Sequence, residues 1–414
     1  MAEGLVARKA ALGLLAGVLG DARPLSDLMG DSGPLAGLPA SDKARAQRLA
    51  LGVLRQVEPI DRLLSPLLRK APPLAVMNLL RLAVSELHGG SAAHGVVNSA
   101  VELARRDQRT MPMAGLINAV LRRLPPPAAM APQRLPRWLR QPMVHAYGRD
   151  AVTAIEAVQA LVPPLDLTLH MGPHPEGLAL ASGSLRLVEP GQVSALPGYS
   201  TGAWWVQDAA AALAVPLLGV QAGETVLDLC AAPGGKTLQL AAAGAGVTAL
   251  DISGPRLARL AENLARTGLA AHLVTADALH WQPDALFDAV LLDAPCSASG
   301  TIRRHPDLPF IKDGSEIPAL VALQAQLFDR ALTFLKPGGR LVFVTCSLLP
   351  EEGEGQLAAA LVRHPDLKVV HRSLPGIPVE WFTADGALRL RPDYWAEQGG
   401  MDGFFMVCVT PGGL

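Results

Sequence analysis

Two cysteines of this 414-residue chain, Cys296 and Cys346, lie where their thiols could do chemistry. They occur in Asp293-Ala294-Pro295-Cys296 and Val344-Thr345-Cys346-Ser347, and each follows a short hydrophobic run. A cysteine thiolate is both a strong nucleophile and a good leaving group, so it can bond to a substrate and later release it. The pair therefore indicates covalent catalysis, and the residues alone do not decide which thiol attacks.

A glycine-bearing turn follows another hydrophobic run, in Cys230-Ala231-Ala232-Pro233-Gly234-Gly235-Lys236-Thr237. Glycines after a strand let the backbone approach a ligand, and the amides that begin the next helix can bind a carboxylate or phosphate. The turn is not a P-loop, because Cys230 stands where that motif needs glycine, and it does not match G-x-G-x-x-G. Alone, it fits an ordinary strand-to-helix turn as well as a cofactor loop.

An aspartate stands near the end of three later hydrophobic runs, at Asp251, Asp277 and Asp293. A carboxylate at the end of a strand is well placed to accept hydrogen bonds from a ribose diol. One such aspartate would say little, because aspartate also caps helices. Three in succession after a glycine turn predict a cleft for a nucleoside cofactor.

To bring these residues together, the chain from residue 223 onward has to form strands and helices that place the ends of several strands at one edge of a sheet. Short, β-favouring apolar runs alternate there with helical stretches, which predicts a doubly wound, mostly parallel sheet of the Rossmann-like type. In such sheets ligands bind at the carboxyl ends of the strands, where every motif above falls. The expected strands are Thr225 to Leu229, Gly246 to Leu250, His272 to Val274, Ala289 to Leu292 and Arg340 to Val344, and two expected helices are Pro255 to Thr267 and Glu316 to Leu335.

The rest of the chain divides into three parts. Residues 1–124 show helical periodicity almost throughout and predict an all-α domain. Residues 125–135 are rich in proline and alanine and read as a linker. Residues 136–215 mix a helix with alternating runs, which predicts a small α+β subdomain, and residues 216–414 form the α/β domain.

Charge is distributed unevenly over the chain. Residues 1–140 hold 19 Lys+Arg against 10 Asp+Glu, a net charge of +9, and residues 141–414 have a net charge of −10. The basic residues are grouped, for example at Arg105, Arg106 and Arg109, which favours a surface that contacts the phosphates of a nucleic acid over a merely solvated helical face.

Composition limits the remaining possibilities. Four cysteines in so long a chain make a disulfide framework unexpected, and no close Cys/His cluster suggests zinc, so no metal is predicted. No uncharged apolar run is long enough to span a bilayer. Arg8-Lys9 and the apolar stretch after it loosely resemble a signal peptide, but an amphipathic helix is the preferred interpretation. We expect a cytoplasmic protein that is a monomer.

The motifs together resemble the RNA 5-methylcytosine methyltransferases that use S-adenosylmethionine. The resemblance rests on residues 230–236, Asp293 to Ser297 and Thr345-Cys346-Ser347. The later half of the N-terminal region, including Val96 to Ala104, resembles NusB-like RNA-binding domains, so the whole chain is similar to the ribosomal small-subunit RNA methyltransferase B family. Further matches are Val206-Gln207-Asp208, Arg303-Arg304-His305-Pro306-Asp307, Lys336-Pro337-Gly338-Gly339 and Asp402-Gly403-Phe404-Phe405.

This resemblance implies roles for the residues above. The loop residues would hold the methionine end of the cofactor, Asp251 its ribose and Asp277 its adenine side, with Asp293 near both cofactor and target base. Cys346 would attack the base, and Cys296 would assist product release. The loop residues concerned are Cys230, Ala231, Ala232, Pro233, Gly234, Gly235 and Lys236.

The sequence departs from the family pattern at a few positions. Gly353 stands where these enzymes often have asparagine, and Ser299 where threonine is common. Neither departure removes a reacting group.

Other functions stay open. The chain could be an RNA-binding assembly factor with an inactive methyltransferase fold, or it could methylate tRNA rather than 16S ribosomal RNA. Retention of both cysteines argues against the first. Methylation of an amino group is disfavoured because Asp-Ala-Pro-Cys replaces the Asn/Asp-Pro-Pro-Tyr/Phe turn typical of that reaction. Methylation of DNA cytosine is disfavoured by the Thr345-Cys346 motif and the basic helical domain.

Overall fold

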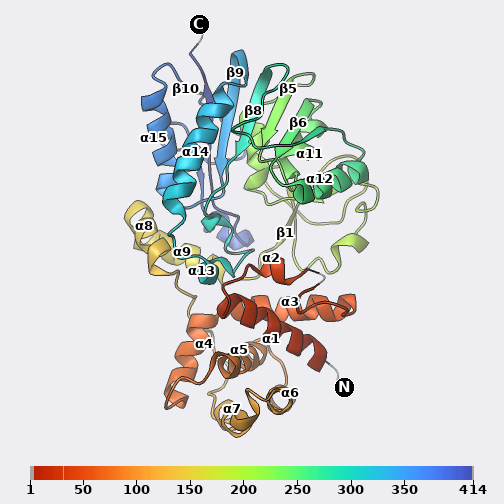
Figure 1. Ribbon diagram of the computed structural model, residues 1–414, viewed down its shortest axis with the longest axis vertical. Helices are drawn as coiled ribbons and strands as arrows, with labels where there is room; N and C mark the ends of the chain where they lie inside the picture. The colour runs from red at the N-terminus through yellow and green to blue at the C-terminus, as the bar shows by residue number, and fades with distance from the viewer. Residues whose placement is uncertain (1–3, 31, 413–414) are drawn as a thin grey trace. The chain divides into compact units, whose positions relative to one another are not determined.

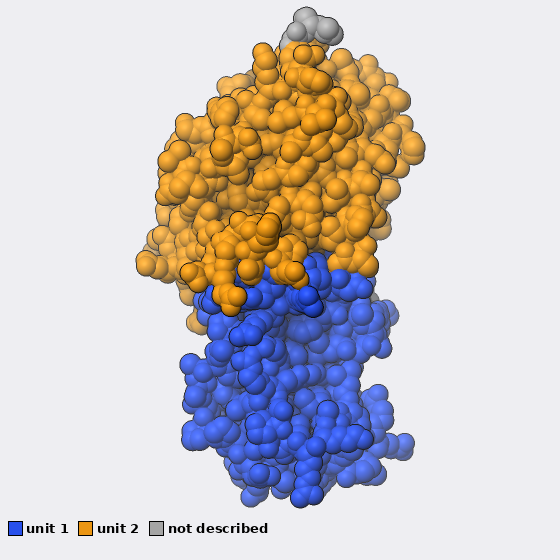
Figure 2. Space-filling model, turned by 90° about the vertical axis from the view of Figure 1, so that its left-hand side faces the viewer, with its two compact units in different colours: residues 1–140, 152–162, 302–313 blue, residues 141–151, 163–301, 314–414 orange. Residues whose placement is uncertain are grey.

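The computed structural model describes residues 4–30 and 32–412, which form two compact units. Figure 2 colours the first unit, residues 1–140, 152–162 and 302–313, and the second unit, residues 141–151, 163–301 and 314–414. Within the described ranges, no helix combines the length and apolar character needed to cross a membrane. The same residues contain no group of three or more histidine, cysteine, aspartate or glutamate side chains that could hold a metal ion.

The first unit is a helical bundle, as its periodicity predicts (Figure 1). Apolar side chains recur on one face of each helix and bury one another, including Leu14, Val53, Leu80 and Ile117, none of which is exposed. The helices are α1 Leu5–Leu19, α2 Leu25–Leu28, α3 Ala40–Leu54, α4 Val57–Leu64, α5 Leu74–His88, α6 Ala93–Arg106 and α7 Ala114–Arg122. Two more helices follow, α8 Arg137–Tyr147 and α9 Arg149–Gln159, and each has residues in both units.

A segment from much later in the chain also belongs to the first unit. Residues 302–313, which contain the short helix α13 (Leu308–Ile311), pack with the N-terminal helices. The Asp307 carboxylate accepts a hydrogen bond of 2.9 Å from the Leu25 amide, and Arg55 Nη2 donates one of 3.1 Å to the Arg303 carbonyl. The helical periodicity of the N-terminal region did not predict this inclusion, because the partner lies about 250 residues away.

The second unit contains a four-stranded antiparallel sheet in the order β2-β3-β1-β4, within the range for which the sequence predicts a small α+β subdomain. A fully buried ion pair between Arg186 and Asp166 joins β3 to β1 at 2.7 Å. Because Asp166 also accepts the Ala209 amide at 3.0 Å, this carboxylate holds the chain that leads into the larger sheet. The strands are β1 Leu165–Leu169, β2 Leu178–Ala179, β3 Leu185–Leu187 and β4 Trp204–Val206.

The second unit is built around an eight-stranded sheet whose path runs β10-β12-β9-β8-β5-β6-β7. The pairs among β9, β8, β5, β6 and β7 are all parallel, which confirms the doubly wound prediction. The strands are β5 Thr225–Leu229, β6 Gly246–Asp251, β7 His272–Thr275, β8 Phe287–Asp293, β9 Leu335–Thr345, β10 Lys368–Val369, β11 Leu388–Leu390 and β12 Phe404–Thr410.

One edge of this sheet is antiparallel. Strand β12 pairs antiparallel with β9, and β10 and β11 pair antiparallel with β12. The apolar run from Phe404 to Val409 is buried on both faces, so its residues carry no alternation that would predict its direction.

Helices cover both faces of the sheet. Successive side chains of a strand point to opposite faces, and the apolar side chains on each face are buried against these helices. Val226 and Leu291 face α10 (Ala214–Leu218) and α11 (Gly235–Ala242), whereas Leu227 and Leu292 face α14 (Ile317–Leu332) and α15 (Glu354–Arg363). Helix α12 (Gly254–Thr267) packs near β6 and β7. The strand order reverses between β5 and β8, which is the position where open α/β sheets bind ligands.

Candidate active site

The two candidate nucleophiles lie side by side at the carboxyl edge of the sheet. Strands β8 and β9 pair in parallel with Asp293 opposite Val344, so the loops that follow them leave the sheet at the same place. The Sγ atoms of Cys296 and Cys346 are 3.3 Å apart, although the residues are 50 positions apart in the chain. This distance allows one thiol to donate a hydrogen bond to the sulfur of the other.

The environment of Cys296 favours its protonated form. A hydrogen bond with Cys346, burial, and the nearby charges of Cys346 and Glu352 raise the pKa of Cys296 well above its usual value of 9.0. Two thiols in contact resist a second ionisation, since two like charges would then lie together. At neutral pH Cys296 is therefore a thiol whose S–H can donate to the Cys346 sulfur.

The glycine turn lies between β5 and α11. Cys230 has a φ of 60°, and Gly234 has a φ of 104° at the residue before the helix. A side chain at Gly234 would meet Leu260 Cδ1 at 2.1 Å, so only glycine fits there. Two hydrogen bonds join the turn to the end of β6: the Asp251 carboxylate accepts the Ala232 amide at 3.1 Å, and the Leu250 carbonyl accepts the Ala231 amide at 3.1 Å.

Lys236 forms an ion pair with Asp293 that joins the glycine turn to the end of β8. Its Nζ lies 2.7 Å from Asp293 Oδ2, and its side chain is 10% exposed against 32% for Asp293. Burial lowers the pKa of Lys236, but the Asp293 carboxylate outweighs burial, and the pKa lies above its ordinary value. The charge interaction between Lys236 and Cys346 also raises the pKa of Lys236, which places this ammonium in the neighbourhood of the thiol.

Asp228, inside β5, is a buried carboxyl group that the sequence analysis did not single out. Its Oδ2 accepts a 2.6 Å hydrogen bond from the Thr237 hydroxyl, whereas its Oδ1 has no hydrogen-bond partner among the described residues. Burial raises the pKa of Asp228 to about 7. An aspartate within an otherwise apolar strand is the signal that could have marked it.

Two further aspartates differ in their surroundings. Asp251 is 1% exposed, and besides Ala232 it accepts the Ser253 amide at 2.9 Å and pairs with Arg256 at 3.5 Å. Asp277 is partly exposed, and it accepts the Leu279 amide at 3.0 Å as a capping aspartate does. The structure thus brings Asp251 into contact with the glycine turn, whereas the described partners of Asp277 are its chain neighbours Leu279, His280 and Trp281.

The remaining loop cysteine is not a nucleophile by its environment. Burial raises the pKa of Cys230 to about 12, and the charges of Asp293, Asp251 and Asp228 add to this effect. Three carboxyl groups therefore surround the glycine turn and favour a positively charged ligand there.

Comparisons with known proteins agree with this geometry. A family described as 16S rRNA methyltransferase RsmB/F matches residues 215–410, and the NusB family matches residues 6–125. The ribosomal RNA small subunit methyltransferase B of Sodalis glossinidius is 37% identical over 367 residues, which cover 79% of this chain and 83% of that protein. The chain belongs to the 16S rRNA methyltransferase RsmB/F family. The resemblance found in the motifs is thereby confirmed.

Other relatives of this RsmB/F family member give the same result. The ribosomal RNA small subunit methyltransferase B of Escherichia coli K12 is 35% identical over 374 residues, 81% of this chain and 86% of that one. A methyltransferase homologue from Pyrococcus horikoshii aligns with a TM-score of 0.54 and 27% identity over 65% of this chain and 93% of its own. The crystal structure of PH0851 covers 98% of both chains with a TM-score of 0.74, a likeness of fold at 22% identity.

Proposed function

We propose that this protein transfers a methyl group from S-adenosylmethionine to carbon 5 of a cytidine in 16S ribosomal RNA, through a covalent adduct with Cys346. The observation that carries the proposal is the pair of thiols 3.3 Å apart beside the Lys236–Asp293 ion pair. Membership of the RsmB/F family supports the choice of substrate, and the net charge of +9 on residues 1–140 supports an RNA partner.

The residues around the glycine turn suit S-adenosylmethionine. The cofactor carries a sulfonium and an ammonium group, and the turn is surrounded by the carboxyl groups of Asp228, Asp251 and Asp293. Gly234 leaves backbone where a side chain would clash, and Oδ1 of Asp228 is a buried acceptor without a partner. We assign residues 230–236 to the methionine end of the cofactor, Asp251 to its ribose and Asp277 to its adenine side.

Each reacting step then has a residue. When bound, S-adenosylmethionine supplies an electrophilic methyl group. Cys346 adds as a thiolate to carbon 6 of the cytosine and makes carbon 5 nucleophilic. Asp293 stabilises the proton on the ring nitrogen as the adduct forms. After carbon 5 is methylated, a base takes the carbon-5 proton, the electrons of that C–H bond restore the ring double bond, and the carbon–sulfur bond breaks with its electron pair on Cys346 Sγ. The Cys296 thiol assists this release by donating a hydrogen bond to the departing sulfur.

The two cysteines are assigned different roles because their environments differ. Cys296 is held protonated by its contact with Cys346 and by burial, which suits a group that gives a proton and not one that attacks. The target base has to leave its stack to reach two thiols at the edge of a sheet. A monomer in the cytoplasm is part of the same proposal.

The test compares two variants with the wild-type protein on RNA from a strain that lacks it, using labelled S-adenosylmethionine. Cys346→Ala should lose methylation by a factor of about 10³ or more while cofactor binding survives. Cys296→Ala should accumulate a covalent protein–RNA adduct. On a denaturing gel this adduct should migrate more slowly than the free protein, because a covalent bond survives denaturation. Full activity of Cys346→Ala would refute the assignment of the nucleophile.

An RNA-binding factor with an inactive methyltransferase fold predicts another outcome. The wild-type protein would then transfer no label to RNA, although it would still bind RNA. Mapping of 5-methylcytidine in the labelled RNA separates 16S ribosomal RNA from tRNA as the substrate.

A further inference from the structure

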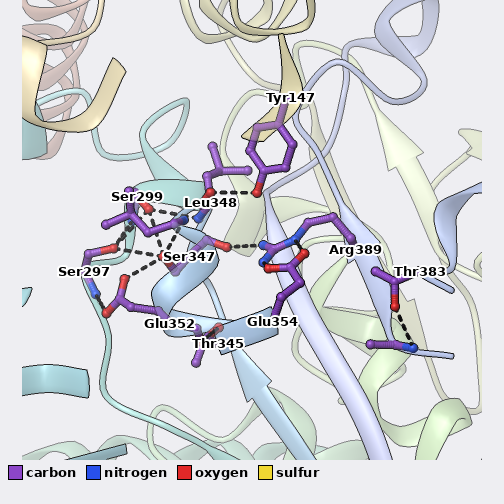
Figure 3. Close-up of polar contacts among 12 residues, drawn as sticks. Tyr147, Ser297, Ser299, Thr345, Ser347, Leu348, Glu352, Glu354, Thr383 and Arg389 are labelled. Carbon is purple, nitrogen blue, oxygen red and sulfur yellow. Dashed lines mark hydrogen bonds and ion pairs between the residues drawn. The ribbon is translucent and has the colours of Figure 1, made fainter. Parts of the chain in front are cut away.

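One buried carboxylate contacts the loops that carry both thiols. Glu352, in the turn after β9, has no exposed surface. Its Oε1 accepts the Ser297 amide at 2.8 Å, and its Oε2 accepts the Ser347 hydroxyl at 2.6 Å (Figure 3). Oε1 also accepts Gln324 Nε2 at 3.0 Å. Ser297 directly follows Cys296, and Ser347 directly follows Cys346. A single side chain is thus bonded next to each cysteine.

Hydroxyl groups extend this contact between the loops. The Oγ atoms of Ser297, Ser299 and Ser347 lie 3.0 to 3.2 Å from one another, and Ser299 Oγ accepts the Leu348 amide at 2.9 Å (Figure 3). The backbone contributes one further bond, from the Gly300 amide to the Cys346 carbonyl at 3.0 Å. Beyond the end of the strands, the hydrogen bonds described between the two loops therefore come mainly from side chains, through the three serines and through Glu352.

The position of Glu352 is itself well fixed. The Thr345 hydroxyl donates to the Glu352 carbonyl at 2.9 Å, and Gln356 Nε2 donates to Gln324 at 3.1 Å behind it. A carboxylate can accept all three bonds that reach Glu352, because it carries only acceptor sites. An amide of the same shape would turn one of these acceptors into a donor that faces an N–H or O–H group. The site thus requires the carboxylate and not only its volume.

We propose that Glu352 is a positioning residue whose carboxylate holds the Cys296 and Cys346 loops together and so fixes the distance between the two thiols. Glu352 acts through Ser297 and Ser347 and touches no reacting atom. The inference rests on the proposed function, in which one thiol attacks and the other assists release. When the loops separate, Cys346 keeps its ability to attack, but the Cys296 thiol no longer reaches the sulfur that has to leave.

The first measurement needs neither RNA nor cofactor. Diamide oxidises two neighbouring thiols to a disulfide: each thiol loses a proton and an electron, the S–S bond forms, and diamide is reduced to the hydrazine. The rate of the Cys296–Cys346 disulfide, followed by mass spectrometry of the linked peptides, therefore reports their proximity. We expect Glu352→Gln to be slower by about tenfold or more. The control is Glu351→Gln, an exposed neighbour in the same turn, which should keep the wild-type rate.

The second measurement uses the reaction itself. Glu352→Gln should lower kcat by about 10- to 100-fold, the effect expected for one lost bond to a charged group, with the KM for RNA within about twofold. It should also accumulate the covalent protein–RNA adduct during turnover, as we expect of Cys296→Ala. A variant that had merely lost structure would show no adduct.

A second variant covers the case in which Glu352→Gln does not fold. Ser347→Ala leaves the carboxylate in place and removes only its bond to the Cys346 loop, and binding of S-adenosylmethionine by calorimetry checks the fold. Wild-type disulfide rates in folded Ser347→Ala or Glu352→Gln would overturn the role of Glu352. Absence of an adduct or of methylation in every variant and in the wild type would overturn the proposed function instead, whatever the disulfide rates.

Discussion

Replacement of Asp228 by asparagine should change how stability depends on pH. The carboxyl group is fully buried, its Oδ1 has no partner, and its pKa is raised by burial from 3.8 to about 7. The folded protein therefore binds a proton at Asp228 that the unfolded chain has lost by about pH 5. A group whose pKa is higher in the folded state contributes its full stabilisation of the folded protein at pH values below its unfolded pKa. This contribution to the free energy of unfolding is lost as the pH rises through the folded pKa.

The size of the effect follows from these two pKa values. Each step of one in pKa corresponds to about 1.4 kcal/mol, so the complete contribution is about 4 kcal/mol. Between pH 5.5 and pH 8.5 the group passes from almost fully protonated to almost fully ionised in the folded state only, and about 2 kcal/mol of the free energy of unfolding is lost. Asparagine keeps the acceptor for Thr237 and does not titrate, so Asp228→Asn should lack this loss.

Urea unfolding at pH 5.5 and pH 8.5 measures the difference. The free energy of unfolding of Asp228→Asn relative to wild type should rise by about 2 kcal/mol between the two pH values. Asp288→Asn is the matched control, because hydrogen bonds from Lys336 and Thr225 hold the pKa of Asp288 well below its usual range and it stays ionised throughout. A difference between Asp228→Asn and wild type that is the same at both pH values would refute the reasoning.

Two further predictions concern the neighbourhood of the site and the basic surface. A Cβ at Gly353 would lie 2.3 Å from Arg389 Nη2 and 2.8 Å from Phe405 Cγ, so Gly353→Ala should lower the free energy of unfolding in urea by about 1–3 kcal/mol. Gly355→Ala is the control and should lower it less, because the nearest atom to a Cβ at Gly355 is 3.3 Å away. Equal losses in the two variants would contradict the crowding at Gly353. Replacing Arg105, Arg122 and Arg123 together by glutamine should reduce the slope of log K against log salt for RNA by about 2, measured by filter binding, and an unchanged slope would remove these residues from the RNA contact.

Much of the α/β core could be predicted from local pattern. The runs Thr225 to Leu229 and Gly246 to Leu250 match β5 and β6 within one residue, because short apolar runs bounded by glycine are strong strand signals. The helix expected at Pro255 to Thr267 also matches α12 within one residue. By contrast, the run Arg340 to Val344 is only the end of β9, which begins at Leu335 and includes Pro337 and two glycines that local pattern assigns to a turn.

The candidate site was only partly predictable. That Cys296 and Cys346 lie at one edge follows from parallel strands, but their 3.3 Å separation depends on the register of β8 against β9, which is set by tertiary packing. Glu351 and Glu352 are indistinguishable in the sequence, and only burial separates the exposed one from the one that holds both loops. The ion pair of Lys236 with Asp293 was not predicted either, because 57 residues separate the partners and only the tertiary fold brings them together. The domain boundaries at residues 124, 135 and 215 stay predictions.

The inclusion of residues 302–313 in the first unit affects how such proteins can be recombined. The chain leaves Cys296 and, six residues later, enters a segment whose packing partners are N-terminal helices. A chimera made by one crossover in the linker would therefore place this segment against helices from another parent. Exchange of an intact helical unit requires at least three pieces of sequence, residues 1–140, 152–162 and 302–313, to move together. The bond between the Leu25 amide and Asp307 spans 282 positions, and because its donor is backbone, it requires the carboxylate at position 307 but tolerates any residue except proline at position 25.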